Sequence, residues 1–175
     1  IAGPIVSVTS QTNINCFGGS NGGATTSITG GVTPYGVQWS GTPTFTTQNV
    51  PTGFNVGIKN ITVTDAAGCV GTASVDITQP TQLVSAIGSF TNVTCFGLNN
   101  GGATILVNGG TPNYSYTWTP SAQTSSVMVS VGANTYVCNV SDANGCTTSQ
   151  SVTISQPQAL VMAASSFSNI SCFGG

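Results

Sequence analysis

Apolar residues alternate with Thr, Ser and Asn along most of the chain, which is the period of a β-strand rather than of a helix. In the first half of the sequence, the alternation is clearest at residues 23–31, 35–40, 60–65 and 72–79. Gly, Pro, Asn or Asp closes each of these segments, as expected for short strands joined by turns. No segment has a sustained helical stripe, so the pattern predicts an all-β protein.

The second half of the sequence repeats this succession of strands. The alternating segments there are residues 103–110, 114–120, 125–131, 135–142 and 149–156. Around seven short strands in about 78 residues are typical of an immunoglobulin-like β-sandwich.

The chain also repeats its motifs at a nearly constant interval. Cys-Phe-Gly occurs at Cys16, Cys95 and Cys172, which are 79 and 77 residues apart. Repetition at a fixed period is the signature of an array of structural units. We therefore predict an immunoglobulin-like repeat over residues 1–80, a second over 81–157, and the start of a third, with its first strand and Cys-Phe-Gly-Gly, over 158–175.

Other repeated residues fit this placement. Trp39 and Trp118 lie in the third strand of each unit, where an immunoglobulin-like sandwich buries its central tryptophan. Asp65 and Asp142 each begin an Asp-x-x-Gly turn between two strands, where Asp caps its own turn and Gly takes a positive φ.

The two units differ at one strand. Tyr136 stands two residues before Cys138, which is the spacing of a tyrosine corner, whereas the first unit has Lys59 and Ile61 at these places. Cys138 therefore has no counterpart in the first unit. Its apolar strand position predicts a buried free thiol.

Charge is sparse, with one Lys or Arg, three Asp or Glu and no His in 175 residues. Without a basic patch, the chain is not expected to bind nucleic acid. No apolar run approaches the roughly 20 residues of a membrane span. No acid/base pair or triad can be assembled, so we predict neither enzymatic activity nor a cofactor.

Six cysteines without any histidine or C-x-x-C pair favour disulfides over zinc, in an oxidising extracytoplasmic setting. Pairing within each unit, Cys16 with Cys69 and Cys95 with Cys146, would close loops of about 50 residues, worth about 4 kcal/mol each. In an end-to-end array, opposite poles of successive sandwiches face each other, so Cys16 could instead reach Cys146 and staple the junction. A third scheme pairs Cys69 with Cys95 and Cys146 with Cys172. The sequence leaves all three open.

Aromatic residues allow two interpretations, a sugar-stacking platform or a core. Residues at i, i+2 and i+4 share one face of a strand, and a stripe at this spacing is more simply core. The stripe consists of Tyr35 and Trp39 in the first unit and of Tyr114, Tyr116 and Trp118 in the second. Three further aromatic residues each follow a cysteine in a Gly-rich loop, and we predict that they plug the junctions between units: Phe17, Phe96 and Phe173.

Taken together, the motifs CFGGSNGGAT (16–25), GGVTPYGVQW (30–39) and ITVTDAAGC (61–69), with ITQP (77–80), resemble the SprB repeat. This family occurs in very large surface adhesins of gliding Bacteroidota. The resemblance implies a cell-surface or extracellular protein, exported by the type IX system and used in adhesion or gliding. It supplies no catalytic residues.

Our leading hypothesis is a structural array that forms the shaft of an extracellular adhesin or filament, stiffened by disulfides. Its partners would be the neighbouring repeats of the same chain. The neutral surface lacks the charged residues that keep strand edges apart, so lateral assembly of copies into fibres is a further expectation. The alternative is a module that displays repeated carbohydrate- or protein-binding sites.

Overall fold

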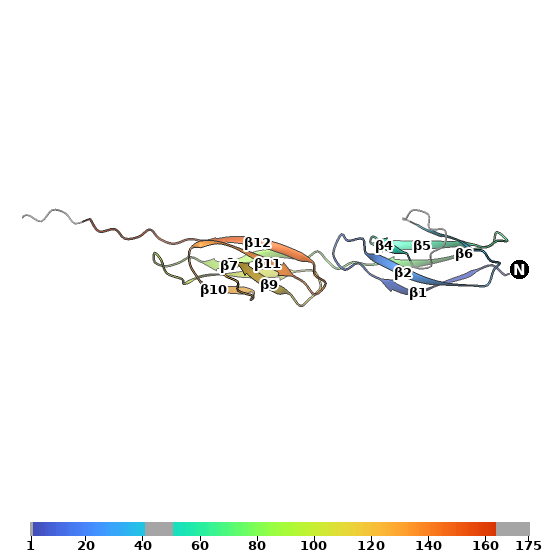
Figure 1. Cartoon of the computed structure of the whole chain (residues 1–175), viewed down its shortest axis with the longest axis horizontal. Coiled ribbons are helices and arrows are strands. Elements are labelled where there is room, and N and C mark those ends of the chain that lie inside the picture. The colour runs from blue at the N-terminus through green and yellow to red at the C-terminus, as the bar shows by residue number, and fades with distance from the viewer. Residues whose placement is uncertain (1, 41–50, 164–175) are drawn as a thin grey trace, which may run out of the picture.

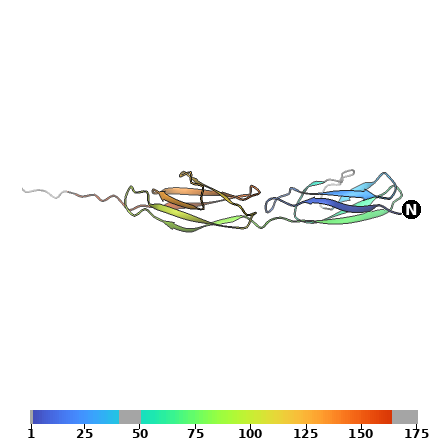
Figure 2. The ribbon, with the colours of Figure 1, turned by 90° about the horizontal axis from the view of Figure 1, so that it is seen from below.

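The computed structural model describes residues 2–40 and 51–163, and these form two β-sandwiches placed end to end in an elongated molecule (Figure 1). We call the sandwich of β1–β6 unit 1 and that of β7–β12 unit 2. Each consists of two three-stranded sheets, seen as two layers in Figure 2. The all-β, immunoglobulin-like prediction is confirmed. Among the described residues, no helix has the length and apolar character needed to cross a bilayer.

Each unit contains two antiparallel sheets with the same strand order. In unit 1, β1-β2-β4 faces β3-β5-β6, and in unit 2 β7-β8-β10 faces β9-β11-β12. The strands of unit 1 are β1 (Ile5–Thr12), β2 (Gly22–Thr29), β3 (Gly36–Trp39), β4 (Thr52–Phe54), β5 (Gly57–Thr64) and β6 (Val70–Ile77). Those of unit 2 are β7 (Val84–Thr91), β8 (Gly101–Asn108), β9 (Ser115–Thr119), β10 (Val127–Val131), β11 (Asn134–Ser141) and β12 (Thr147–Ile154).

The described residues give six strands per unit rather than the predicted seven. Between the third strand and the hairpin that closes each unit, the described residues contain one short strand, β4 or β10, and it joins the sheet of the first strand. Residues 158–163, where the first strand of a third repeat was predicted, contain no strand. Cys172 and Phe173 lie outside the described residues.

Alternation along the strands builds a separate core in each unit. In β11, Tyr136, Cys138 and Val140 point inward and their neighbours point outward. The two tryptophans are buried between the sheets, with 2% of Trp39 and none of Trp118 exposed. Because two independent cores form, each unit resembles a domain that buries its own apolar face.

The tyrosine corner is present in unit 2. The Tyr136 hydroxyl donates a hydrogen bond to the carbonyl oxygen of Gly132, at 3.0 Å. In unit 1, Lys59 takes this place: its Nζ donates to Oδ1 of Asn55, and it lies 5.9 Å from the centre of the Phe54 ring. Both side chains therefore anchor the strand to the residue four positions earlier.

The first and last strands of each unit lie side by side and close the sandwich along one seam. In unit 2, the amide of Gln150 on β12 donates to the carbonyl oxygen of Ser85 on β7, at 2.9 Å. In unit 1, the side-chain amide of Gln11 on β1 donates to the carbonyl oxygen of Asp76 on β6, at 3.3 Å. The last strand of unit 1 leads directly into the first strand of unit 2, so the seam strands β6 and β7 are consecutive along the chain (Figure 1).

Candidate functional site: the disulfide-linked junction

The loop of residues 13–21, which we call the Cys16 loop, presents Cys16 at the end of unit 1 that faces unit 2. Its buried Ile14 donates a backbone hydrogen bond to the carbonyl oxygen of Thr78, at 2.9 Å. Gly18, with a φ of 75°, donates its N–H to Oε1 of Gln79, at 2.8 Å. The loop is thus fastened to the segment that leaves β6, so Cys16 has a fixed position.

The tight turn of residues 142–146, which we call the Asp142 turn, presents Cys146 from the opposite side. The Asp142 carboxylate is buried and accepts three backbone hydrogen bonds. Oδ1 accepts the N–H groups of Asn144 and Cys146, both at 2.9 Å, and Oδ2 accepts that of Thr111 at 2.8 Å. One side chain therefore shapes the turn and ties it to the loop between β8 and β9.

Backbone N–H donors, foremost that of Thr111, hold the pKa of the Asp142 carboxyl below its ordinary value, although burial acts in the opposite direction. Asp65 has the same arrangement in unit 1, where the N–H of Val32 is the foremost donor that lowers its pKa. A carboxyl whose pKa is lowered by folding stabilises the folded state above its unfolded pKa, and this contribution is lost as the pH falls through the folded pKa. Acid should therefore loosen both turns.

The Asp142→Asn variant should lower the urea midpoint of unit 2 at pH 7, because an amide group offers one acceptor oxygen and turns an N–H toward a donor. When the pH is lowered below about 4, the urea midpoint of wild-type unit 2 should decrease, whereas the midpoint of the variant should change little. Trp118 fluorescence at pH 7 and pH 3, recorded in a Trp39→Phe background, measures both effects. Asp76→Asn, which changes an exposed carboxylate, is the control and should have the urea midpoint of the wild type. If the midpoint of Asp142→Asn equalled that of this control, the stabilising role of the Asp142 carboxylate would be contradicted.

Two covalent connections join the units. Cys16 and Cys146 form a disulfide with an S–S distance of 2.02 Å and a Cα–Cα distance of 5.7 Å, although 130 residues separate them in sequence. The other connection is the polypeptide between β6 and β7. Of the three pairings that the sequence left open, this is the junction staple.

Noncovalent contacts reinforce the staple on both sides. Nδ2 of Asn144 donates to the carbonyl oxygen of Asn15 across the junction, at 2.9 Å. The N–H of Gly110 donates to the carbonyl oxygen of Thr81 in the connecting segment, also at 2.9 Å. A Cβ at Gly109 would come within 1.9 Å of the carbonyl oxygen of Gln82, so only glycine allows this approach.

The within-unit pairings do not occur, because their cysteines lie at opposite poles of one sandwich. Cys69 is free and half-buried in the turn between β5 and β6, beside Gly3 and away from the Cys16 loop. Cys95 is free and exposed in the loop between β7 and β8, away from the Asp142 turn. Cys138 is also free, and its thiol is fully buried in the core of unit 2, where burial raises its pKa.

Phe17 does not plug the junction. It lines a hollow there together with Leu83 and Gly145, but 52% of it is exposed. Ile14 fills the inner position of the loop instead, and this leaves Phe17 outside. Phe96, its counterpart at the other end of unit 2, is exposed to 59%.

The aromatic stripe belongs to the cores. Trp39 and Trp118 are buried, and Tyr35, Tyr114 and Tyr116 are half-buried and pack against them. The hydroxyls of Tyr35 and Tyr114 each donate to a glycine carbonyl oxygen five residues earlier, at 2.5 and 2.7 Å. The tryptophan faces are therefore not available to stack on a ligand.

Two features of the junction were missed by sequence reasoning. The pattern assigns Gln79 only to the end of the strand segment 72–79 and to the motif ITQP, yet its side chain holds the Cys16 loop. Gln156 holds Gly97 in the same way, at 2.8 Å. The signal was present, because Gln-Pro recurs at the same place in both units. Asn144 gave no such signal, since the first unit has Ala67 at its position.

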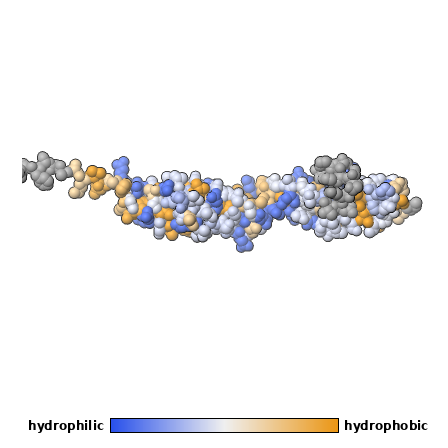
Figure 3. All heavy atoms as spheres, in the orientation of Figure 1, coloured by the Kyte–Doolittle hydropathy of each residue, from blue (hydrophilic) through white to orange (hydrophobic). Residues whose placement is uncertain are grey.

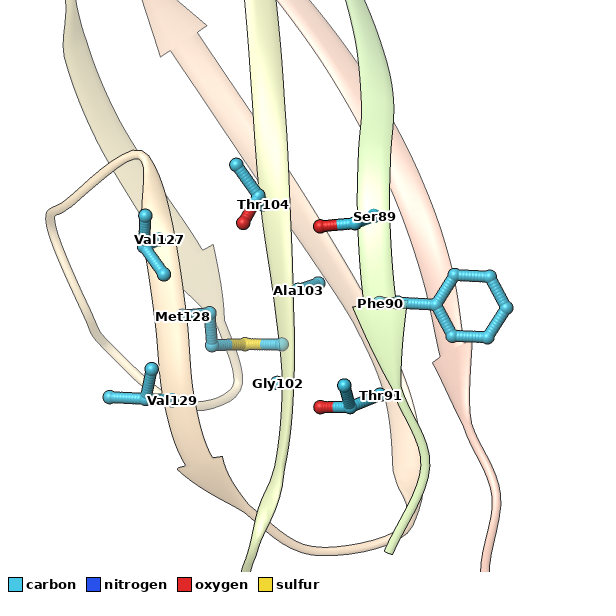
Figure 4. A pocket seen from close by; sticks show the side chains of 9 residues that line it. All are labelled: Ser89, Phe90, Thr91, Gly102, Ala103, Thr104, Val127, Met128 and Val129. Atoms are coloured by element: carbon cyan, nitrogen blue, oxygen red, sulfur yellow. The ribbon is translucent and has the colours of Figure 1, made fainter.

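A shallow hollow lies on the outer surface of sheet β7-β8-β10 (Figure 4). Gly102 lies between its two sides, and the hydroxyl groups of Ser89, Thr91 and Thr104 line one of them. Val127 and Val129 line the opposite side, whereas the Phe90 ring points away. Among the described residues, no group of three or more His, Cys, Asp or Glu side chains is placed to bind a metal ion.

The SprB repeat family model matches the chain at two places, residues 8–44 and 87–123, and this confirms the family resemblance. Each match runs from within the first strand to just beyond the third, so it includes the Cys-Phe-Gly loop and the central tryptophan. SprB repeats indicate a repeat region of the surface-adhesin type. No curated protein matches the chain.

Among solved structures, the chain is similar to the three N-terminal domains of the highly immunogenic outer capsid protein (Hoc) of bacteriophage RB49, with 15% identity and a TM-score of 0.53. That alignment covers 86% of this chain and 58% of the Hoc structure. The amphioxus IgVJ-C2 molecule aligns over 86% of this chain and 98% of its own length, with 15% identity and a TM-score of 0.36. At this identity, the likeness to Hoc shows the fold alone.

Proposed function

We propose that this chain is a segment of the shaft of an extracellular adhesin or filament, exported by the type IX system and used in cell-surface adhesion or gliding. The observation that carries the proposal is the disulfide between Cys16 and Cys146, because it links two separately folded units rather than sealing either one. A disulfide in this place restricts how the two units can rotate relative to each other.

Two connections at separate points restrict bending more than one does. A single linker acts as a hinge, whereas a linker and a disulfide together oppose rotation about either attachment. Pro80 restricts the linker further, and the hydrogen bond from Gly110 to Thr81 ties it to unit 2. The array should therefore behave as a stiff rod at this junction.

The stiffness can be measured by single-molecule energy transfer between dyes on non-canonical residues that replace Ile58 and Leu106, which are exposed in units 1 and 2. The oxidised chain should give one narrow distance distribution, and Cys146→Ser should broaden it. Cys95→Ser is the matched control, because it removes a thiol that forms no disulfide here. Equal widths for the oxidised chain and Cys146→Ser would show that the staple does not stiffen the junction.

A second candidate function is the display of a binding site, and the hollow of Figure 4 is the observation that favours it. Its hydroxyl groups and valine side chains suit a neutral, partly apolar ligand such as an oligosaccharide. Binding to an array of neutral glycans that is abolished by Val129→Glu, at an exposed position, would support this function. An absence of binding would count against it.

A further inference from the structure

We propose that the outer ends of units 1 and 2 are the halves of a second stapled junction, in which Cys95 forms a disulfide with Cys69 of a second copy of this chain. The inference rests on the proposed shaft and names the partner and the bond that extend it.

The far end of unit 2 repeats the loop that presents Cys16. In the loop of residues 92–100, the N–H of Val93 donates to the carbonyl oxygen of Ser155, at 2.9 Å, as Ile14 does to Thr78. The N–H of Gly97 donates to Oε1 of Gln156, at 2.8 Å, which matches the bond between Gly18 and Gln79. Cys95 is therefore held in the same setting as Cys16.

The free end of unit 1 likewise repeats the turn that presents Cys146. Oδ1 of Asp65 accepts the N–H groups of Ala67 and Cys69, at 3.0 and 2.8 Å, and Oδ2 accepts that of Val32, at 3.0 Å. The same three bonds shape the Asp142 turn. Cys69 therefore has the geometry in which its counterpart forms a disulfide.

The hollow beside Cys16 has two sides, whereas, in the part of the chain that the structure describes, the hollow beside Cys95 has one. The hollow at the observed junction is formed by Cys16, Phe17 and the connecting segment on one side and by residues 145–147 of unit 2 on the other. The hollow at the far end is formed by Cys95, Phe96 and residues 157–160, with no second side among the described residues.

The apolar segment after this loop is also uncovered. Leu160 is 93% exposed, whereas Leu83, its counterpart in the repeat, is 8% exposed because the loop between β8 and β9 covers it. Val161 and Met162 continue the exposed segment, and Figure 3 shows hydrophobic residues grouped where the chain leaves unit 2. A following unit is the occupant that fits this surface, since a unit already covers the equivalent one.

The junction between copies would lack the linker of the observed junction and also one side-chain contact. Ala67 replaces Asn144, so the free end of unit 1 cannot donate the side-chain hydrogen bond that Asn144 makes to Asn15. Noncovalent association of two copies should therefore be weak, and the disulfide should be the main link. The contact joins different surfaces of the two copies, so it extends into an open chain rather than a closed dimer.

The bond forms by thiol–disulfide exchange with glutathione disulfide as the oxidant. The Cys95 thiolate attacks one sulfur of glutathione disulfide, which gives a protein–glutathione mixed disulfide and releases one glutathione. The Cys69 thiolate of the second copy then attacks the Cys95 sulfur and releases the second glutathione. Two protein thiols are oxidised, and one glutathione disulfide is reduced to two thiols.

The test uses two variants of the full chain, both with Cys172→Ser, so that each carries one of the two proposed thiols. One variant has Cys69→Ser and the other Cys95→Ser. Mixed and incubated with glutathione disulfide, they should form a dimer linked between Cys95 and Cys69. Peptide mapping without reduction should find the Cys95–Cys69 crosslink in about tenfold excess over either symmetric crosslink, Cys95–Cys95 or Cys69–Cys69.

A different outcome would overturn the proposal. Symmetric Cys95–Cys95 or Cys69–Cys69 dimers in equal or greater amount would show that the two ends do not recognise each other. The Cys16–Cys146 disulfide is intact in both variants, so its stiffness can be measured in the same samples. Failure of this test therefore remains distinguishable from failure of the proposed shaft.

Discussion

Pulled by its two ends under oxidising conditions, the unfolded chain should reach a length about 450 Å shorter than that of its Cys146→Ser variant. The disulfide bypasses the 130 residues between Cys16 and Cys146, and each residue of an extended chain spans about 3.3–3.6 Å. Force then passes from the start of the chain through Cys16 to Cys146 and on to the end. Most of both sandwiches lies outside this path.

Force spectroscopy measures this difference as the total contour length. Cys69→Ser is the matched control, since it removes the equivalent cysteine from the turn of unit 1 and leaves the staple intact. It should give the short length under oxidising conditions and the long one after reduction. A long contour length for the oxidised wild type would show that the staple is absent or carries no load.

Replacement of Trp118 by alanine should destabilise unit 2 by about 3–5 kcal/mol, because it removes a large, fully buried side chain. It also removes the hydrogen bond from Nε1 to the carbonyl oxygen of Ser125, at 2.9 Å, which holds the loop before β10. Unit 1 has its own core and should keep its unfolding midpoint. Urea unfolding followed by hydrogen exchange resolves the two units, and the remaining Trp39 fluorescence reports on unit 1.

Trp39→Ala is the mirror-image control. It should destabilise unit 1 and leave the Trp118 signal of unit 2 unchanged. Loss of both units together in either variant would contradict the division into two cores. A loss below about 1 kcal/mol would mean that the cavity collapses with little cost.

The fold could be predicted from sequence because its signals are local and occur twice. Alternation located the strands, and the Tyr136–Cys138 spacing located a corner that the structure shows in the bond to Gly132. The predicted count of seven strands exceeds the six strands of unit 2, because it came from the average immunoglobulin-like pattern. The segment between β3 and β5 has few alternating residues of its own.

The junction was harder to predict, because it depends on which residues meet at the poles of two different units. Sequence separation does not carry that information, since Cys16 is far closer in sequence to Cys69 than to its partner Cys146. Phe17 was misplaced for a related reason. Two apolar residues of one short loop, Ile14 and Phe17, compete for one inner position, and the hydrogen bond from Ile14 to Thr78 decides it.

The sparse charge of this chain has a consequence for the conditions in which it works. Of its four charged side chains, Lys59, Asp65 and Asp142 are buried, and Asp76 alone is exposed. Dissolved ions shorten the range of electrostatic forces from about 30 Å at 0.01 M to about 8 Å at 0.15 M, but this surface presents almost no charge for them to screen. The rod should therefore keep its electrostatic properties from dilute water to brine, while like-charge repulsion, which keeps most proteins apart in solution, is nearly absent.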